Sequence, residues 1–191
     1  MQERLNVLIV AKTETLYASL RKVISGRVSQ TFYASTMTLA KQKLSAGNVD
    51  IVIINTPLPD EFGVESALQI AQHFQTGIML LVGTDEYERV RYKVESLGIF
   101  LLSRPIKVQA LDQSLSLMIA MQHKLHVLAE ENSRLRRRMD ELGLVSRAKC
   151  LLIEKKGMSE QEAHYYLERE AMNKGYSKRD IAEDIISRLG I

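Results

Sequence analysis

The sequence predicts an α/β fold, a doubly wound parallel sheet of five strands, followed by a long coiled-coil helix and a small all-α bundle of three helices. Three observations support this prediction. Through residues 1–120, segments with strand periodicity and helix periodicity alternate strictly. Residues 121–142 carry a seven-residue apolar repeat, and residues 143–191 hold short amphipathic helical segments. We take these three ranges as the expected domains.

Five short segments rich in β-branched residues are the expected strands, over residues 5–10, 29–33, 50–54, 77–82 and 99–102. The third is almost continuously apolar, as expected for a strand buried on both faces of a parallel sheet. A helical pattern follows each strand. The clearest cover residues 64–73 and 87–97, and the last begins near residue 108. This alternation favours the flavodoxin-like arrangement, in which ligands bind at the carboxyl ends of the central strands.

Residues 8–10, 49–63 and 98–106 resemble, in order and spacing, the receiver domains of bacterial response regulators. The resemblance covers about residues 5–122. It implies a phosphorylation site with two acidic residues after the first strand and a phosphoacceptor aspartate after the third. It also implies a Thr or Ser after the fourth strand and a Lys before the fifth-strand proline.

This chain lacks that set of residues. The corresponding positions hold Ala11, Lys12, Asn55, Val82 and Arg104. Without carboxylates Mg²⁺ has no hard oxygen ligands, and an asparagine amide is not a nucleophile that forms an acyl phosphate. We therefore expect a pseudo-receiver, meaning a receiver fold with a degenerate phosphorylation site, no catalytic residue, no metal and no cofactor. An alignment shifted by a residue or two would instead make the acids Glu14, Asp50 or Asp60.

Residues 111–156 contain no proline, so one long helix is the simplest interpretation. Within it, residues spaced alternately by three and four form a heptad seam: Met118, Met121, Leu125, Leu128, Asn132, Leu135, Met139 and Leu142. Leucines at the d positions and a lone Asn132 at an a position favour a parallel two-stranded coil. We expect a homodimer through this coil. The alternative is a helix packed on its own chain.

Three amphipathic segments follow, and two of them begin with capping-box patterns, at residues 159–162 and 177–180. Together with the short elements at residues 148–149, 157–160 and 171–172, they resemble the ANTAR domain of transcription antiterminators, over about residues 132–190. The resemblance implies a dimer that binds RNA stem-loops in leader transcripts. The chain departs from the family at Cys150 and Glu168, where many members carry Gly and Arg.

RNA hairpin loops present unstacked bases to aromatic and guanidinium planes, and basic side chains hold the phosphates. The expected RNA contacts are Arg147, Lys149, Tyr165, Arg169, Lys174, Tyr176, Lys178 and Arg179. The strongest segment is 173–179, in which basic residues flank a tyrosine at a helix N-terminus, where backbone N–H groups also attract phosphate.

We therefore predict a transcription antitermination regulator whose partners are leader RNA hairpins, a second copy of the chain and a regulatory sensor protein. Two alternatives stay open: a DNA-binding response regulator and a receiver-based protein-interaction module. A net charge of +3 does not decide between them. We expect no enzyme, because no nucleophile–base set, phosphate loop or metal-ligand spacing stands out. A single cysteine and the lack of a long apolar run predict a cytoplasmic protein without membrane contact.

Overall fold

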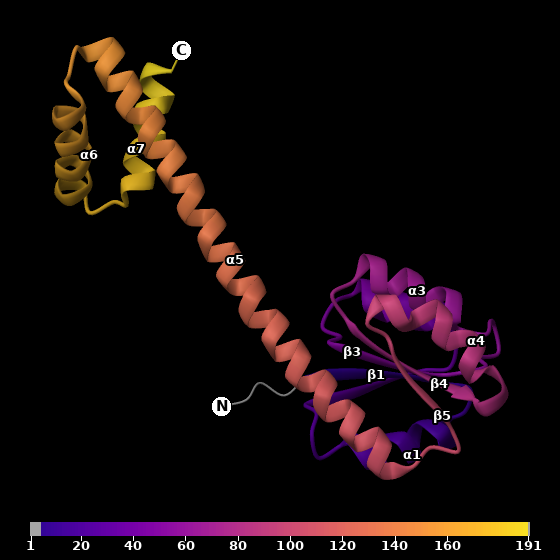
Figure 1. Ribbon diagram of the computed structural model, residues 1–191. Coiled ribbons are helices and arrows are strands. Elements are labelled where there is room, and N and C mark those ends of the chain that lie inside the picture. The colour runs from indigo at the N-terminus through magenta and orange to yellow at the C-terminus, as the bar shows by residue number, and fades with distance from the viewer. Residues whose placement is uncertain (1–4, 191) are drawn as a thin grey trace. The chain divides into compact units, whose positions relative to one another are not determined.

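The computed structural model describes residues 5–190, which divide into two compact units, 5–125 and 126–190 (Figure 1). The first unit is built on a five-stranded parallel sheet in the order β2-β1-β3-β4-β5. Its strands are β1 (Asn6–Ala11), β2 (Gln30–Ala34), β3 (Ile51–Asn55), β4 (Gly77–Gly83) and β5 (Phe100–Arg104). The predicted doubly wound α/β fold is confirmed, and each strand begins within one residue of its expected start.

Helices follow each strand: α1 (Glu14–Ile24), α2 (Met37–Ser45), α3 (Val64–His73), α4 (Thr84–Val94) and α5 (Val108–Lys156). Threonines begin the first two, since the Thr13 and Thr36 hydroxyls accept hydrogen bonds from backbone N–H groups of the first turn. The helix expected over 87–97 begins three residues earlier, directly at the end of β4. Its last three residues form a separate 3₁₀ turn, Glu95–Leu97.

Side-chain alternation along the strands separates two apolar cores, one on each face of the sheet. Leu8, Val52 and Leu80 face the side covered by α2, α3 and α4. Ile53 and Leu81 face the other side, covered by α1 and the beginning of α5. Figure 1 shows α3 and α4 on one face of the sheet, and α1 with the first turns of α5 on the other.

The beginning of α5 belongs to the core of the first unit. Leu111, Leu115 and Met118 are almost fully buried there. A Cβ placed on Gly77 at the start of β4 would lie 3.2 Å from the Met118 Cε, so helix and strand are in close contact. The sequence predicted Met118 on the dimer seam, and this prediction is wrong. Met118 is 1% exposed because the helix that follows the last strand needs an apolar face to cover the sheet.

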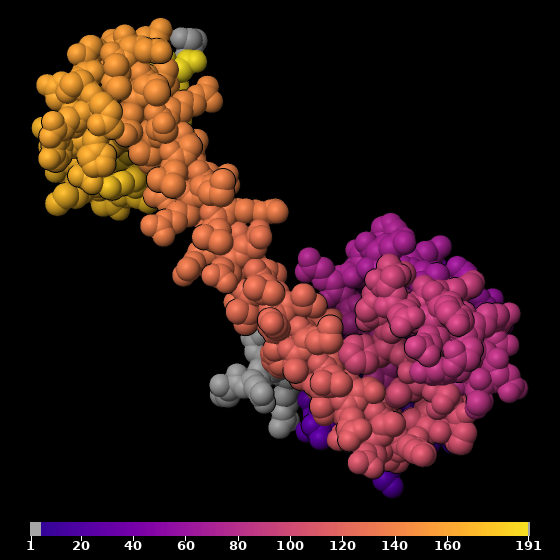
Figure 2. All heavy atoms as spheres, in the orientation of Figure 1, coloured from indigo at the N-terminus to yellow at the C-terminus, as the bar shows by residue number. Residues whose placement is uncertain are grey.

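The second unit consists of the rest of α5 with α6 (Glu160–Lys174) and α7 (Lys178–Leu189), a three-helix bundle as predicted. Both capping boxes are present, at Ser159 and Glu162 and at Ser177 and Asp180. Small and branched side chains fill the core: Ala148, Leu152, Ala163, Leu167, Ala171, Ile181, Ala182 and Ile185. Figure 2 shows this bundle, in orange to yellow, as one packed body. Within residues 5–190, no helix is long and apolar enough to cross a bilayer.

Candidate nucleic-acid interface and receiver edge

The carboxyl ends of β1, β3, β4 and β5 bring together residues that the sequence analysis expected at a degenerate phosphorylation site. Asn55, the last residue of β3, pairs with Ala11 of β1 and Leu81 of β4. Gly83 of β4 pairs with Arg104 of β5. Because side chains alternate between faces, Ala11, Asn55 and Arg104 all belong to the sheet face that carries Ile53 and Leu102. Lys12 follows β1 directly and is exposed.

Val82 differs from the expectation. Its side chain is fully buried in the core on the opposite face of the sheet, with Leu80. Gly83 is the β4 residue that shares a face with Asn55 and Arg104. The reason is the two-residue period of a strand, which moves a side chain to the other face with each step. Gly83 therefore takes the place at this edge that the sequence assigned to Val82.

Asp50 and Asp60, two of the acids that a shifted alignment would assign to the phosphorylation site, accept hydrogen bonds from backbone N–H groups. The Asp50 carboxylate accepts a 2.7 Å hydrogen bond from the backbone N–H of Asn6, at the amino ends of the strands. The Asp60 carboxylate accepts hydrogen bonds from the backbone N–H groups of Met37 and Thr38 at the start of α2. Desolvation raises the pKa of Asp60, but these hydrogen bonds outweigh it and hold the pKa below its ordinary value. Among residues 5–190, no group of three acidic, His or Cys side chains is arranged to hold a metal ion.

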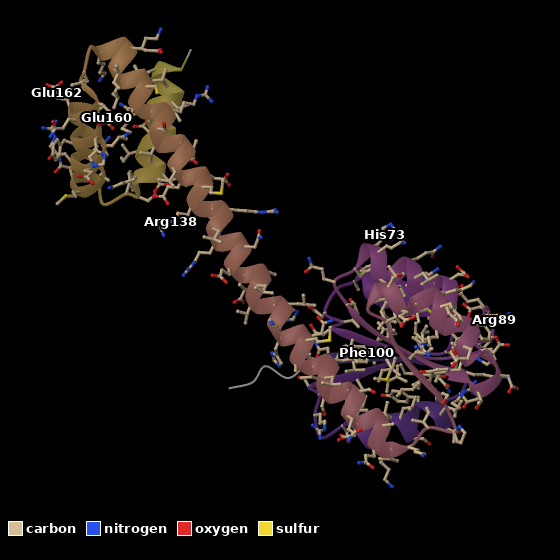
Figure 3. All side chains as sticks on the ribbon, viewed as in Figure 1. His73, Arg89, Phe100, Arg138, Glu160 and Glu162 are labelled. Carbon is tan, nitrogen blue, oxygen red and sulfur yellow. The ribbon has the colours of Figure 1, made fainter. Side chains whose placement is uncertain are left out.

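In the second unit, two of the expected RNA contacts are paired with carboxylates of neighbouring helices. The Lys149 Nζ on α5 lies 2.5 Å from Oε1 of Glu160 on α6, and the Lys178 Nζ on α7 lies 2.6 Å from Oε1 of Glu168. Glu160 projects from the first turn of α6 (Figure 3). Hydrogen bonds from the two lysines lower the pKa of both glutamates. Sequence reasoning missed these pairs because they join different helices.

Four other expected contacts divide into paired and unpaired cations. Lys174 and Arg179 form ion pairs within their own helices, with Glu170 at 3.1 Å and Glu183 at 2.9 Å. Arg147 and Arg169 are exposed, and neither forms an ion pair with any part of the chain that the structure describes. The guanidinium groups of these two arginines are therefore the most available for phosphate or base contacts.

An open groove of about 720 Å³ runs between the end of α5 and α6. Its lining includes Lys156, Tyr165, Arg169 and Met172. Tyr165 is 60% exposed, whereas its neighbour Tyr166 packs against the bundle core with the Lys156 ammonium 5.4 Å from its ring centre. The expected contacts Tyr165 and Arg169 thus share one groove, and Lys156 and Met172 are lining residues that sequence reasoning missed. Tyr176, between α6 and α7, is 62% exposed.

The heptad residues after Met118 form an exposed apolar row along α5, which we call the α5 row. Its members are between 50% and 71% exposed: Met121, Leu125, Leu128, Leu135, Met139 and Leu142. Asn132, in the middle of the row, is also exposed. Charged side chains such as Arg138 project from the same helix (Figure 3). A row of apolar side chains that stay exposed on one helix is typical of an interaction surface.

Comparisons with known proteins agree with this arrangement. Residues 133–186 match the family model of the ANTAR domain. The transcriptional regulatory protein PdtaR of Mycobacterium tuberculosis is 27% identical over 141 residues, which are 74% of this chain and 69% of that protein.

Solved structures resemble the first unit. The signal receiver domain of an HD domain-containing protein from Pseudomonas fluorescens Pf-5 is 27% identical with a TM-score of 0.59, covering 66% of this chain and 94% of that one. A response regulator receiver domain protein from Clostridium thermocellum, at 16% identity and a TM-score of 0.56, covers 63% and 98% and shows a common fold alone. The chain therefore joins a receiver-type domain to an ANTAR domain.

Proposed function

We propose that this protein is a transcription antitermination regulator that binds hairpins of leader RNA through residues 143–191. The observation that carries the proposal is the match of residues 133–186 to the ANTAR domain, on a bundle whose groove holds an exposed tyrosine beside an unpaired arginine. Tyr165 stacks on an unpaired base, and Arg169 and Arg147 contact phosphates or base planes.

The active form is a homodimer joined through the α5 row. Leucines at three of the d positions, Leu128, Leu135 and Leu142, and the single polar residue Asn132 at an a position support a parallel two-stranded coil over a helix that covers its own chain. Two bundles held by one coil present two RNA-binding surfaces, so one dimer is suited to a pair of hairpins.

Control does not require phosphorylation. The end of β3 carries an amide at Asn55, and the end of β1 carries Ala11 and Lys12 where acidic metal ligands would stand. Regulation instead acts through a sensor protein that binds the dimer, or through the dimerisation equilibrium itself. Treatment of the full chain with acetyl phosphate and Mg²⁺, followed by intact mass measurement, is expected to show no phosphoryl adduct. An adduct on the protein would contradict this part of the proposal.

The test of RNA binding is a titration of the full chain against a two-hairpin leader RNA and a DNA duplex of equal length, over a range of salt. We expect preferential RNA binding, with a salt dependence of a few phosphate contacts. Arg169→Ala is expected to weaken it by about tenfold, as for a charge-assisted contact. Arg91→Ala, on the receiver helix α4, is the matched control and is expected to leave affinity unchanged.

Two outcomes favour the alternatives. Preference for the DNA duplex supports a DNA-binding response regulator. Binding to neither nucleic acid supports a receiver-based protein-interaction module, and both results contradict the proposed function.

A further inference from the structure

A group of arginines lies in the middle of α5, before the residues of this helix that pack in the bundle. Arg134, Arg137 and Arg138 are exposed, and none of them forms an ion pair with any residue between 5 and 190. Their spacing of three and four residues places them on one side of the helix, and we call them the arginine face. Arg137 makes only long hydrogen bonds, of 3.4 and 3.5 Å, to Ser133 one turn earlier. All three guanidinium groups are therefore available to bind an anion.

The arginine face lies on the same side of α5 as the bundle. Residues 11 positions apart are separated by about three helical turns, so they lie on nearly the same side of a helix. The residues 11 positions after the three arginines are Val145, Ala148 and Lys149. Val145 and Ala148 pack in the bundle core, and Lys149 pairs with Glu160 of α6. Figure 3 shows Arg138 extending from α5 on the side where α6 lies.

The turn between α6 and α7 lies at the level of these arginines along α5. Lys149 contacts the first turn of α6, and α6 then runs back along α5 for 14 residues to Lys174, about 21 Å (Figure 1). Arg138 lies 11 residues, or about 17 Å, before Lys149. The turn carries the exposed side chains of Tyr176 and Lys178. The arginine face therefore continues the basic surface of this turn along the coil.

The arginine face keeps its charge and stays exposed when two copies of the chain pair. Glu130 and Glu141 border it, and neither forms an ion pair within residues 5–190, so three cations stand against two carboxylates. With Asn132 at position a of the heptad, Arg134 and Arg137 occupy the outer positions c and f. The face is therefore directed away from the α5 row and remains open to solvent in a dimer joined through that row.

We propose that the arginine face binds the phosphates of the RNA stem next to the loop that the bundle binds, a role that rests on the RNA binding proposed above. Each guanidinium donates hydrogen bonds to phosphate oxygens, for which its planar fork is suited. Proteins recognise an A-form stem mostly by its shape and backbone. The arginine face therefore adds affinity that depends on the length of the stem, whereas the bundle supplies the preference for the loop.

Hairpins with the same loops and different stem lengths test this proposal. The full chain is titrated with a two-hairpin RNA whose stems span a full helical turn, and with one whose stems span less than half a turn and consist of G·C pairs. In the double variant Arg134→Gln/Arg138→Gln, affinity for the long-stem RNA is expected to fall about tenfold, and its salt dependence to lose about two phosphate contacts. Affinity for the short-stem RNA is expected to stay unchanged.

The matched control is Arg21→Gln/Lys22→Gln, which removes two exposed cations of α1 and changes the net charge equally. It is expected to bind both RNAs like the parent. Glutamine is a good helix former, so the double variant on α5 is expected to fold and to remain a dimer by sedimentation equilibrium.

The outcomes separate this proposal from the function on which it rests. An unchanged affinity of the α5 variant for the long-stem RNA, an equal loss for both stem lengths, or an equal loss in the control overturns the role of the arginine face and leaves loop binding intact. A parent chain that binds neither RNA contradicts the proposed function and the arginine face together.

Discussion

The Lys178 ammonium donates a 2.6 Å hydrogen bond to Glu168 and joins the first turn of α7 to the middle of α6. Lys149 makes the corresponding contact between α5 and Glu160. Two of the cations expected to hold RNA phosphates therefore already neutralise carboxylates of the same bundle. A phosphate that binds either lysine replaces a carboxylate, so the net gain is smaller than for an unpaired cation.

Removing one of these carboxylates is expected to tighten RNA binding. In Glu168→Gln the Lys178 ammonium loses its anionic partner, and RNA affinity at low salt is expected to rise by roughly threefold, the scale of one exposed ion pair. The dissociation constant for a two-hairpin leader RNA measures this effect. Glu65→Gln, which removes the anionic partner of Lys93 in the receiver unit, is the control. A loss of affinity in Glu168→Gln would mean that Lys178 needs Glu168 to hold it in position.

The α5 row predicts a dimer that one charge disrupts. Leu135 is 52% exposed at a d position, and Leu135→Glu places two carboxylates opposite one another in a parallel coil. Sedimentation equilibrium is expected to find this variant monomeric at concentrations where the parent chain is a dimer. The matched control is Val127→Glu, since Val127 is also exposed, at 62%, but lies outside the seam. A dimeric Leu135→Glu protein, or a monomeric parent, would rule out the coil.

Met118 separates folding from dimerisation. Because it is buried against the sheet, Met118→Ala is expected to lower the free energy of unfolding of the receiver unit by about 2–5 kcal/mol. The dimer dissociation constant, measured well below the unfolding temperature, is expected to stay unchanged. Denaturant unfolding combined with sedimentation gives both quantities. A higher dimer dissociation constant with an unchanged free energy of unfolding would show instead that Met118 contributes to the dimer seam.

The sequence predicted most of the fold because its apolar periodicity directly reflects burial. The continuous apolar run predicted the strand Ile51–Asn55, and the spacing of serine and acidic residues predicted the two capping boxes. Periodicity did not reveal which part of α5 covers its own sheet, because Met118 fits a heptad and a receiver core equally well. The sequence analysis assigned Val82 to the edge position that Gly83 occupies, because neighbouring residues of a strand point to opposite faces of the sheet and a shift of one residue changes the face.

The candidate site was less predictable. Residue type marked Tyr165 and Arg169 as RNA contacts, and both line the α6 groove. Residue type could not distinguish the unpaired Arg169 from the paired Lys178, because the partner Glu168 lies on another helix.

Transcription read-through in vitro measures directly whether this protein acts as an antiterminator. The template carries a leader with two hairpins upstream of an intrinsic terminator, and the measured quantity is the fraction of full-length transcript as the full chain is added. We expect this fraction to rise with the dimer concentration without a phosphoryl donor, and Arg169→Ala to weaken the rise. A read-through fraction that stays constant while the protein binds the same leader RNA would contradict antitermination.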